Sequence, residues 1–579
     1  MATGGLAERL AAWAETRANG RAARAAARVK PATGFVSQPE PRSIGMQARG
    51  RHLVSGHFLM AGRLIEAPGK TLWSVAPPDP AFMAEAHGFT WLDDLAALGD
   101  AGARARAQDW VWDWIARYGR GRGPGWVPDL TGRRLIRLIN HAIFLLNGRD
   151  KAQAATFFAV LSAQVAFLDR RWHAAAPGLP RFEALTGLIY AALALTGTQA
   201  QVGAALAALA EDCANVINAQ GGIPSRNPED LLEVLTLLTW AAQALTEAGR
   251  VLPAAHGHAM LRIAPCLRTL RHADGSLARF HGGGRGAEGR LDAALAASGV
   301  KGQAGPGPAM GFLRMSGGRT SVIVDAADPP GGAAGTSGHA STLAFELTSG
   351  RRPVIVSCGS GTGFGGDWRR AGRATASHST LALEGYSSSR FGKGLGDALA
   401  ERAHVVLARP GEGPDGHGLF LAHDGWSRTH GLTHARNLWL SRDGRRLSGQ
   451  DALGPKTATE REALAAVLRR KGAGPLRFAL RFHLHPDADA SLDLGDTAVS
   501  IALKSGEVWV FRPADPRGLA LEPSVYLERG RLHPRPARQI VVAGETDGTE
   551  VLIGWTLAKA QDSPLAIRDL ERDDTPFRL

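Results

Sequence analysis

The residue types best suited to proton chemistry gather in one stretch of the second half of the chain. His339 stands just before an apolar, strand-like run, and His378 stands directly before another. Cys358 ends the strand between them, and a tight turn at Ser349-Gly350 lets the flanking strands pair. The three side chains could therefore meet at one rim of a sheet, where an imidazole can act as an acid or a base. A single histidine is more often a hydrogen-bonded structural residue, so both interpretations stay open.

A glycine-rich segment in the same stretch matches the dinucleotide-binding fingerprint. It reads Gly361-Thr-Gly-Phe-Gly-Gly366 and follows a predicted strand. The residues after it are mostly charged and include Gly372, without the apolar stripe of a helix that would close a βαβ unit. We therefore interpret the segment as a loop and expect no organic cofactor.

The composition is that of a globular protein with an excess of basic residues. Of 579 residues, 44% are hydrophobic and 21% charged, and 67 Lys and Arg against 54 Asp and Glu give a net charge of +13. This balance favours an anionic partner, which could be nucleic acid, a membrane surface or an acidic polymer. No known nucleic-acid-binding module is recognisable, so we expect no nucleic-acid partner.

The number of cysteines and the length of the apolar segments indicate in which cellular compartment the protein works. The chain has 3 widely spaced cysteines, so a disulfide framework is not expected. Apolar stretches such as residues 184–195 are shorter than the roughly 18–20 residues of a membrane span, so no transmembrane segment is predicted. The first thirty residues are rich in arginine and lack the apolar block of a signal peptide. We therefore expect a cytoplasmic protein.

Two halves of the chain differ in their hydrophobic period. From about residue 81 to residue 271 the apolar residues recur at helical spacing, and glycines close the runs, which predicts stacked helical hairpins. After a Gly- and Pro-rich passage at 282–308 the period becomes two, which predicts an antiparallel β-sandwich. The expected domains are a basic lead-in segment over 1–80, a helical domain over 81–300 and a sandwich over 305–579.

The strand predictions are specific enough to be tested. Strand-like runs occur at 320–325, 343–348, 353–358, 380–383, 404–408 and 419–422. Later strands should turn at Asp443-Gly444 and at Ser505-Gly506. In residues 477–485 the apolar positions alternate with Arg and His, which predicts one buried face and one polar face.

Several motifs, in this order over most of the chain, resemble those of the heparinase II/III-like polysaccharide lyases. In the helical half they are His87-Gly-Phe-Thr-Trp-Leu, Trp126-Val-Pro-Asp-Leu-Thr-Gly-Arg-Arg and Gln220-Gly-Gly-Ile-Pro-Ser-Arg-Asn-Pro. In the other half they are the His339 and His378 segments, His423-Asp-Gly-Trp, His430-Gly-Leu-Thr-His434 and Arg481-Phe-His-Leu-His-Pro. The resemblance implies an N-terminal incomplete α/α toroid followed by a C-terminal antiparallel β-sandwich.

The same resemblance implies β-elimination next to a uronic acid. Such a lyase neutralises the sugar carboxylate, removes the C5 proton and protonates the leaving oxygen. By resemblance His339 is the acid or base of the sandwich, and His378 matches a histidine that commonly binds a structural metal. Cys358 stands where the family tends to have an acidic ligand. Because thiolate and imidazole both suit zinc, a divalent metal held by His378 and Cys358 is a possible cofactor.

The helical half departs from the family pattern. Arg226 or Asn227, just before a helix starting near Pro228, could grip the carboxylate, although Asn227 could equally cap that helix. The family tyrosine position is occupied by Asp230 or a close neighbour, and Tyr386, in a loop after the His378 strand, is the substitute that the sequence offers.

Four further residues are candidates for substrate binding. Trp126 could stack on a sugar, although tryptophans at this spacing more often pack in a core. His423, His434 and Arg481 fall on the polar faces of predicted strands and could bind sugar acids, although solvated sheet-face residues are commoner.

The sequence thus predicts a lyase that cleaves uronic-acid-containing polysaccharide or oligosaccharide by β-elimination. The alternative is a catalytically degenerate protein that binds anionic glycans on the same scaffold. The partner in either case is an acidic polysaccharide or oligosaccharide. Family members of this kind usually work in the periplasm or cell envelope, which is the alternative to a cytoplasmic location.

Overall fold

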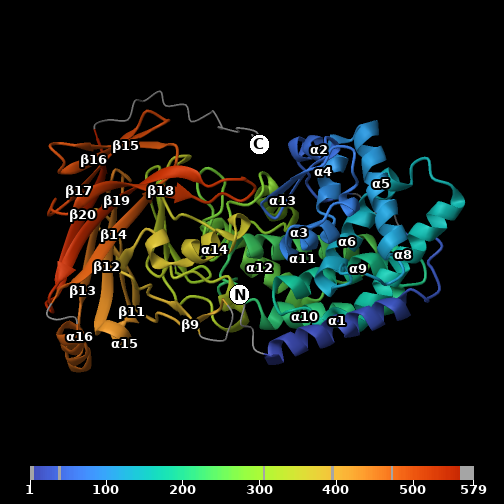
Figure 1. The fold of residues 1–579 in the computed structure, drawn as a ribbon, viewed down its shortest axis with the longest axis horizontal. Coiled ribbons are helices and arrows are strands. Elements are labelled where there is room, and N and C mark those ends of the chain that lie inside the picture. Colours follow the sequence, from blue (N-terminus) through green and yellow to red (C-terminus); the bar gives the residue numbers. More distant parts are fainter. Residues whose placement is uncertain are drawn as a thin grey trace.

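The computed structural model describes residues 6–36, 41–303, 305, 307–392, 397–470 and 474–560. Helices fill the N-terminal half and two large antiparallel sheets fill the C-terminal half, side by side along the long axis of the molecule (Figure 1). The predicted fold class, a helical toroid followed by an antiparallel β-sandwich, is confirmed.

The helical half contains thirteen α-helices in the described residues. They are α1 (Leu6–Ala26), α2 (Gln47–Val54), α3 (Pro80–Gly88), α4 (Trp91–Leu98), α5 (Ala101–Tyr118), α6 (Pro128–Asn140), α7 (Ala142–Leu146), α8 (Lys151–Arg171), α9 (Leu179–Ala194), α10 (Val202–Asn215), α11 (Pro228–Glu247), α12 (Ala254–Thr269) and α13 (Arg290–Ala297). A small hairpin of β1 (His57–Met60) and β2 (Arg63–Glu66) lies between α2 and α3.

The central helices α6 and α9 approach closely because two glycines face each other. A Cβ atom on Gly132 would lie 2.2 Å from the carbonyl oxygen of Glu183, and one on Gly187 would lie 2.3 Å from the Cα of Gly132. Arg133 on α6 then reaches the Glu183 carboxylate through two hydrogen bonds of 2.9 and 2.7 Å. Larger residues at either glycine would push the two helices apart.

The basic N-terminal segment forms part of the helical domain. Helix α1 packs along α8 at the lower edge of the molecule (Figure 1). Helix α8 begins with a capping box formed by Asp150 and Gln153. Within the described residues one helical stretch, Lys151–Ala174, is long and apolar enough to cross a membrane, and 56% of its most apolar window is buried inside the protein. Such burial is typical of a core helix.

The sandwich consists of two long sheets. The first has the order β18-β19-β14-β6-β5-β4-β3, with β7 also paired to β14, and the second has the order β10-β11-β12-β13-β20-β17-β16-β15. The first sheet comprises β3 (Phe312–Gly317), β4 (Thr320–Asp325), β5 (Phe345–Ser349), β6 (Arg352–Val356), β7 (Leu381–Leu383), β14 (Leu476–Leu484), β18 (Leu519–Tyr526) and β19 (Arg535–Thr546). The second comprises β10 (Val405–Gly413), β11 (Gly416–Trp426), β12 (Leu432–Ser441), β13 (Arg446–Gly454), β15 (Ala488–Asp493), β16 (Ala498–Leu503), β17 (Val508–Pro513) and β20 (Val551–Lys559).

Smaller elements complete the C-terminal half. They are α14 (Gly366–Arg373), α15 (Ser427–His430), α16 (Ala458–Arg470) and the short pair β8 (Arg390–Phe391) and β9 (Leu399–Glu401). The two predicted hairpins are present: β12 pairs with β13 across Gly444, whose φ is +68°, and β16 pairs with β17 across Gly506, whose φ is +84°. Both glycines adopt the left-handed conformation that such turns require.

Strand β14 follows the predicted alternation with one exception. The four apolar side chains predicted to be buried are buried, namely Phe478, Leu480, Phe482 and Leu484. His483 was predicted on the polar face, but only 3% of it is exposed. It is buried because its ring hydrogen-bonds to Ser524 and to the carbonyl oxygen of Ala376 at 2.8 and 2.9 Å.

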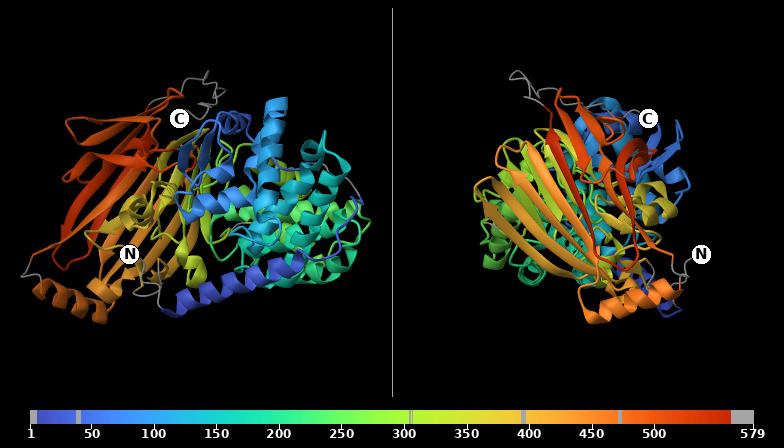
Figure 2. Two further views of the ribbon diagram at one scale, coloured as in Figure 1. Left: turned by 45° about the vertical axis from the view of Figure 1, so that its right-hand side comes forward. Right: turned by 90° about the vertical axis from the view of Figure 1, so that its left-hand side faces the viewer.

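The first sheet joins the two halves through opposite faces of β4. Val322 and Val324 point into the apolar core between the two sheets, whereas Ile323 belongs to the apolar cluster of the toroid helices. Phe312 on β3 also packs into the toroid cluster. The views in Figure 2 show the first sheet lying between the toroid and the second sheet. We call the contact zone between this sheet and the toroid the seam.

Candidate active site at the seam of the two domains

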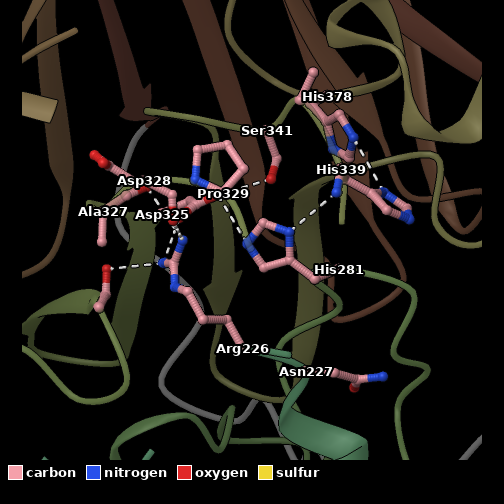
Figure 3. Close-up of polar contacts among 12 residues, drawn as sticks. Arg226, Asn227, His281, Asp325, Ala327, Asp328, Pro329, His339, Ser341 and His378 are labelled. Atoms are coloured by element: carbon pink, nitrogen blue, oxygen red, sulfur yellow. Dashed lines mark hydrogen bonds and ion pairs between the residues drawn. The ribbon is translucent and has the colours of Figure 1, made fainter. Parts of the chain in front are cut away.

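Three histidines from three separate segments meet at the seam (Figure 3). His281 lies in the loop after α12, His339 lies in the loop before β5, and His378 precedes β7. The backbone N–H of His339 donates to Nδ1 of His281 at 3.1 Å, and Nδ1 of His339 lies 3.3 Å from Nε2 of His378. The structure thus brings His339 and His378 together and adds His281 as a third member.

Asp325, the last residue of β4, orients His281. Its Oδ2 lies 3.4 Å from Nε2 of His281 and accepts a hydrogen bond from the Ser341 hydroxyl at 2.7 Å. Because Nδ1 of His281 accepts an N–H, the proton of the neutral ring sits on Nε2 and faces the carboxylate. The Asp325–His281 pair therefore fixes the backbone at His339.

Arg226 closes this group from the helical side, and its guanidinium has no N–H group to spare. One N–H donates to Oδ1 of Asp325 at 2.6 Å. The others donate to backbone carbonyl oxygens, those of Met310, Gly311, Ala327 and Asp328, at 2.7 to 3.1 Å. An arginine side chain has five N–H donors, and all five are used inside the protein. We call Arg226, His281, Asp325, His339 and His378 the seam cluster.

Burial keeps the imidazoles of the seam cluster neutral. It lowers the pKa of His378 to about 3 and that of His339 well below its ordinary value, with neighbouring histidines adding to both shifts. Burial alone would raise the pKa of Asp325, but Arg226 and His281 outweigh it and hold that pKa well below its usual range. The cluster is therefore one carboxylate, one guanidinium and three neutral rings at neutral pH.

A second group that also contains an aspartate, an arginine and paired histidines lies between the two sheets. Nε2 of His434 and Nε of Arg436 both contact Oδ1 of Asp451 at 2.7 Å, and the indole of Trp555 donates to Oδ2 at 2.9 Å. Nδ1 of His434 lies 3.3 Å from Nε2 of His423. Burial lowers the pKa of His434. Arg436 and His434 outweigh the effect of burial on Asp451 and lower its pKa to about 2, as Arg226 and His281 do for Asp325 in the seam. We call these five residues the sandwich cluster.

Comparison with known proteins decides the family. The family model described as "Heparinase II/III-like, C-terminal" matches residues 300–556. The chain is also 32% identical over 544 residues to FtsZ-localized protein C of Caulobacter vibrioides, an alignment that covers 91% of each protein. The chain belongs to the heparinase II/III-like family.

Solved structures agree with this assignment at the level of the fold. A structure titled heparinase III aligns with a TM-score of 0.67 and 12% identity over 93% of this chain and 89% of the other. Heparan sulfate lyase HepC from Pedobacter heparinus, as a mutant, aligns with a TM-score of 0.58 and 14% identity over 95% and 89%. These structures thus share the architecture of this chain, a helical domain followed by a β-sandwich.

Arg226 and Asn227, the predicted carboxylate binders, are both engaged in structural contacts. The hydrogen bonds of Arg226 leave no donor for a sugar carboxylate, so the role predicted for it is corrected to a tie between toroid and sandwich. Asn227 is the N-cap of α11, and its side-chain oxygen accepts from the backbone N–H groups of Glu229 and Asp230. The capping alternative is therefore the one observed, and Asn227 points away from the histidines in Figure 3.

Tyr386 does not join the seam cluster. Its ring packs on His430 at 4.4 Å between centroids, and 46% of the residue is exposed. No hydrogen bond links it to His339 in the described residues. The hypothesis that Tyr386 replaces the family tyrosine therefore lacks the proximity it needs.

Three of the four predicted substrate-binding residues are buried. Trp126 is 2% exposed, packs on Trp114 and Phe167 and donates to the carbonyl oxygen of Tyr118. His423 and His434 belong to the sandwich cluster and are 1% and 0% exposed. Trp126 is a core residue, the alternative typical of its spacing. The predictions for His423 and His434 were wrong because a polar side chain on an alternating strand can point into a hydrogen-bonded interior rather than into water.

Arg481 is the fourth predicted substrate-binding residue. It is half-buried on β14, and its Nη1 lies 3.4 Å from a carboxylate oxygen of Glu522. Its role in binding a sugar acid stays a prediction.

The residues predicted to bind zinc do not fit that ion. His378 contacts His339, whereas Sγ of Cys358 lies 3.5 Å from Nδ1 of His483 and 3.9 Å from the Ser524 hydroxyl. Among the described residues no group of three or more His, Cys, Asp or Glu side chains could hold a metal ion. A structural zinc site has four ligands, and the side chains around His378 and Cys358 do not supply them.

Two members of the seam cluster were missed in the sequence. Asp325 ends a strand that was predicted, and a carboxylate at the end of an otherwise apolar strand was the available signal. His281 directly precedes the Gly- and Pro-rich passage, which was interpreted only as a connection between domains.

Proposed function

We propose that this chain is a heparinase II/III-like protein that binds an anionic oligosaccharide without cleaving it. The observation that carries the proposal is the saturation of Arg226, whose five N–H groups all donate to protein acceptors. A net charge of +13 favours an anionic ligand.

β-Elimination makes demands that the seam cluster does not meet. The C5 proton of a uronate becomes acidic only when the neighbouring carboxylate is neutralised, and Arg226, the arginine predicted to neutralise it, donates all its N–H groups to protein acceptors. His339 itself is only 3% exposed. A proton acceptor must come within hydrogen-bond reach of the substrate, so the burial of this ring supports binding rather than catalysis.

A uronate lyase is the second candidate, and one feature of the seam favours it. His339 and His378 are neutral imidazoles 3.3 Å apart, so one can accept a proton and share it with the other. In this alternative His339 is the base or acid of β-elimination on a uronic-acid-containing polysaccharide.

One experiment separates the two candidates. The purified protein is incubated with a panel of uronate polymers, and the ultraviolet absorbance of unsaturated uronate is followed with a characterised heparinase as the positive control. Binding to the same polymers is measured in parallel. Binding without a rise in absorbance is the expected result, whereas a rise that is lost in His339→Ala would replace the proposal by the lyase.

The curated relative supports a further part of the proposal. FtsZ-localized protein C is named for its localisation with FtsZ and aligns over 91% of this chain. We propose the same localisation for this chain, together with the cytoplasmic location expected from its sequence. A fluorescent fusion imaged with labelled FtsZ tests the shared localisation, because a uniform or envelope-wide signal would contradict it.

A further inference from the structure

A groove with a volume of about 360 Å³ lies on the first sheet at the end remote from the seam cluster. It is formed where the β3–β4 turn, the β5–β6 turn and the loop after α12 come together. Gly318 and Gly350 in the two turns have φ values of +49° and +54°, and the N–H of Gly350 donates to the carbonyl oxygen of Arg319 at 2.7 Å. This bond places Arg319 and Arg351 on adjoining turns.

Two serine hydroxyls, those of Ser316 and Ser321, line the floor of the groove. Ser316 on β3 is the cross-strand partner of Ser321 on β4, and Ser321 is the partner of Thr348 on β5. The Ser321 and Thr348 hydroxyls are 2.8 Å apart. Cross-strand partners share a face of a sheet, so three hydroxyls stand in a row across three strands. Thr348 is buried behind Ser321, so the two serine hydroxyls are the ones that a sugar could meet.

Guanidinium groups stand around this row. Arg314 lies on the same face of β3, where its Nε donates to the Ser316 hydroxyl at 3.0 Å and its Nη1 donates to the carbonyl oxygens of Thr269 and Arg271. These bonds hold its side chain in place and leave Nη2 without a partner in the described residues. Arg319 and Arg351 are exposed at the turns. The lining contains three arginines and no acidic residue.

A second cavity in the described part of the chain has a different character. Its volume is about 620 Å³, and it lies at the opposite edge of the sandwich. Two carboxylates, Asp487 and Asp489, line it together with His485, Lys504 and Arg538. Mixed charge makes it a poor site for a polyanion, so the smaller, wholly basic groove is the better candidate.

The groove is separate from the seam cluster although both use β4. Ser321 and Asp325 are four residues apart on the same face, which at about 3.3 Å per residue is about 13 Å. Between them Ile323 packs into the toroid cluster. A ligand in the groove therefore does not touch His339.

We propose that this groove binds the acidic groups of the oligosaccharide, with the guanidinium groups of Arg314, Arg319 and Arg351 on carboxylate or sulfate and the serine hydroxyls on the sugar. This inference rests on the proposed glycan binding and assigns it a place. Guanidinium forks match both carboxylate and sulfate geometry, so either acid fits the site.

The test compares two double variants that lose the same charge. Arg319→Gln with Arg351→Gln removes the two exposed cations of the groove, and Arg469→Gln with Arg470→Gln removes two exposed cations at the end of α16. Arg314 is left intact because it also holds the end of α12. Calorimetry measures binding of a sulfated heparin-derived tetrasaccharide, an unsulfated hyaluronan-derived tetrasaccharide and a neutral cellotetraose at constant salt.

We expect the groove variant to bind the acidic tetrasaccharides at least about tenfold more weakly, and the α16 variant to change by less than about twofold. Loss for both tetrasaccharides assigns recognition to the shared carboxylate, and loss for the sulfated one alone assigns it to sulfate. Equal losses of affinity in the two variants, or an unchanged affinity in the groove variant, would show that the groove is not the binding site, whereas the proposal of glycan binding would stand. Failure of the wild type to bind any acidic tetrasaccharide overturns the proposed function and the groove together.

Discussion

The seam cluster and the sandwich cluster share an aspartate, an arginine and a pair of histidines. Each contains one aspartate shared by an arginine and a histidine, and each has a pair of imidazoles 3.3 Å apart. They differ in what surrounds the arginine. Arg226 joins two domains through backbone carbonyls, whereas Arg436 lies inside the sandwich and bonds to the carbonyl oxygens of Leu343 and Ser379.

This likeness teaches that histidine and carboxylate composition does not identify an active site. The sandwich cluster is fully enclosed between the sheets, yet it contains the histidine, aspartate and arginine side chains that are typical of an active site. A chemical role needs a path for the substrate and an uncommitted donor or acceptor at the reacting atom. Arg226 donates all its N–H groups to protein acceptors and the sandwich cluster is enclosed, so we assign ligand binding to the groove, whose lining contains three arginines and no acidic residue.

Acid should produce the largest effect, because it acts on both clusters at once. A histidine in an unfolded chain has a pKa near 6.5, whereas burial lowers that of His378 to about 3 and those of His434 and His423 as well. The unfolded chain therefore binds more protons, and stability present above pH 6.5 is lost as the pH falls. Each such imidazole contributes up to about 1.4 kcal/mol per pH unit, so several kcal/mol should disappear between pH 6.5 and 4.5.

Urea unfolding at pH 7.5, 6.5, 5.5 and 4.5 measures this loss. Asp94 and Asp230 act in the opposite direction, because burial raises the pKa of each to about 6 and their contribution is lost as the pH rises from about 4 to 6. They are fewer than the buried histidines, so the free energy of unfolding should still increase as the pH rises from 4.5 to 7.5. A free energy of unfolding that is flat across this range would contradict the neutral, buried state of both clusters.

Asp451→Ala should be the most damaging single substitution. It leaves Arg436, His434 and the Trp555 indole without their shared acceptor in a fully buried place, and removal of one partner of such a pair costs about 3–5 kcal/mol. The loss is measured by chemical denaturation at pH 7.5. Asp451→Asn keeps the volume and one acceptor oxygen, so it should cost clearly less. Equal costs would mean that packing rather than the charge matters.

Asp325→Ala should cost less than Asp451→Ala, about 2–3 kcal/mol, because Arg226 keeps its four carbonyl acceptors. The same substitution loosens the seam, so the toroid and the sandwich should begin to unfold separately. Differential scanning calorimetry would show a broadened or split transition. A cost equal to that of Asp451→Ala with a single sharp transition would show that the two clusters are equivalent.

The architecture could be predicted from the sequence, whereas the burial of individual polar and aromatic side chains could not. The change of period near residue 300 predicted both domains, because apolar spacing is set by each element locally. The fate of His423, His434 and Trp126 was not predictable in the same way, since their burial depends on which sheet or helix packs above them. Arg226 is the clearest case: its acceptors lie between residues 310 and 328, about 100 residues away along the chain.

His339→Gln should have the smallest effect and is the sharpest test of the seam as a structural site. The amide can replace the single side-chain hydrogen bond to His378, and the backbone N–H that donates to His281 is unchanged. The expected loss is about 1 kcal/mol of unfolding free energy, measured by urea titration. Binding of an acidic tetrasaccharide should be unaltered, because the groove lies about 13 Å along β4 from Asp325. If the substitution instead weakened glycan binding tenfold at unchanged stability, His339 would contact the ligand and the seam would regain the role in recognition that the structure here gives to the groove.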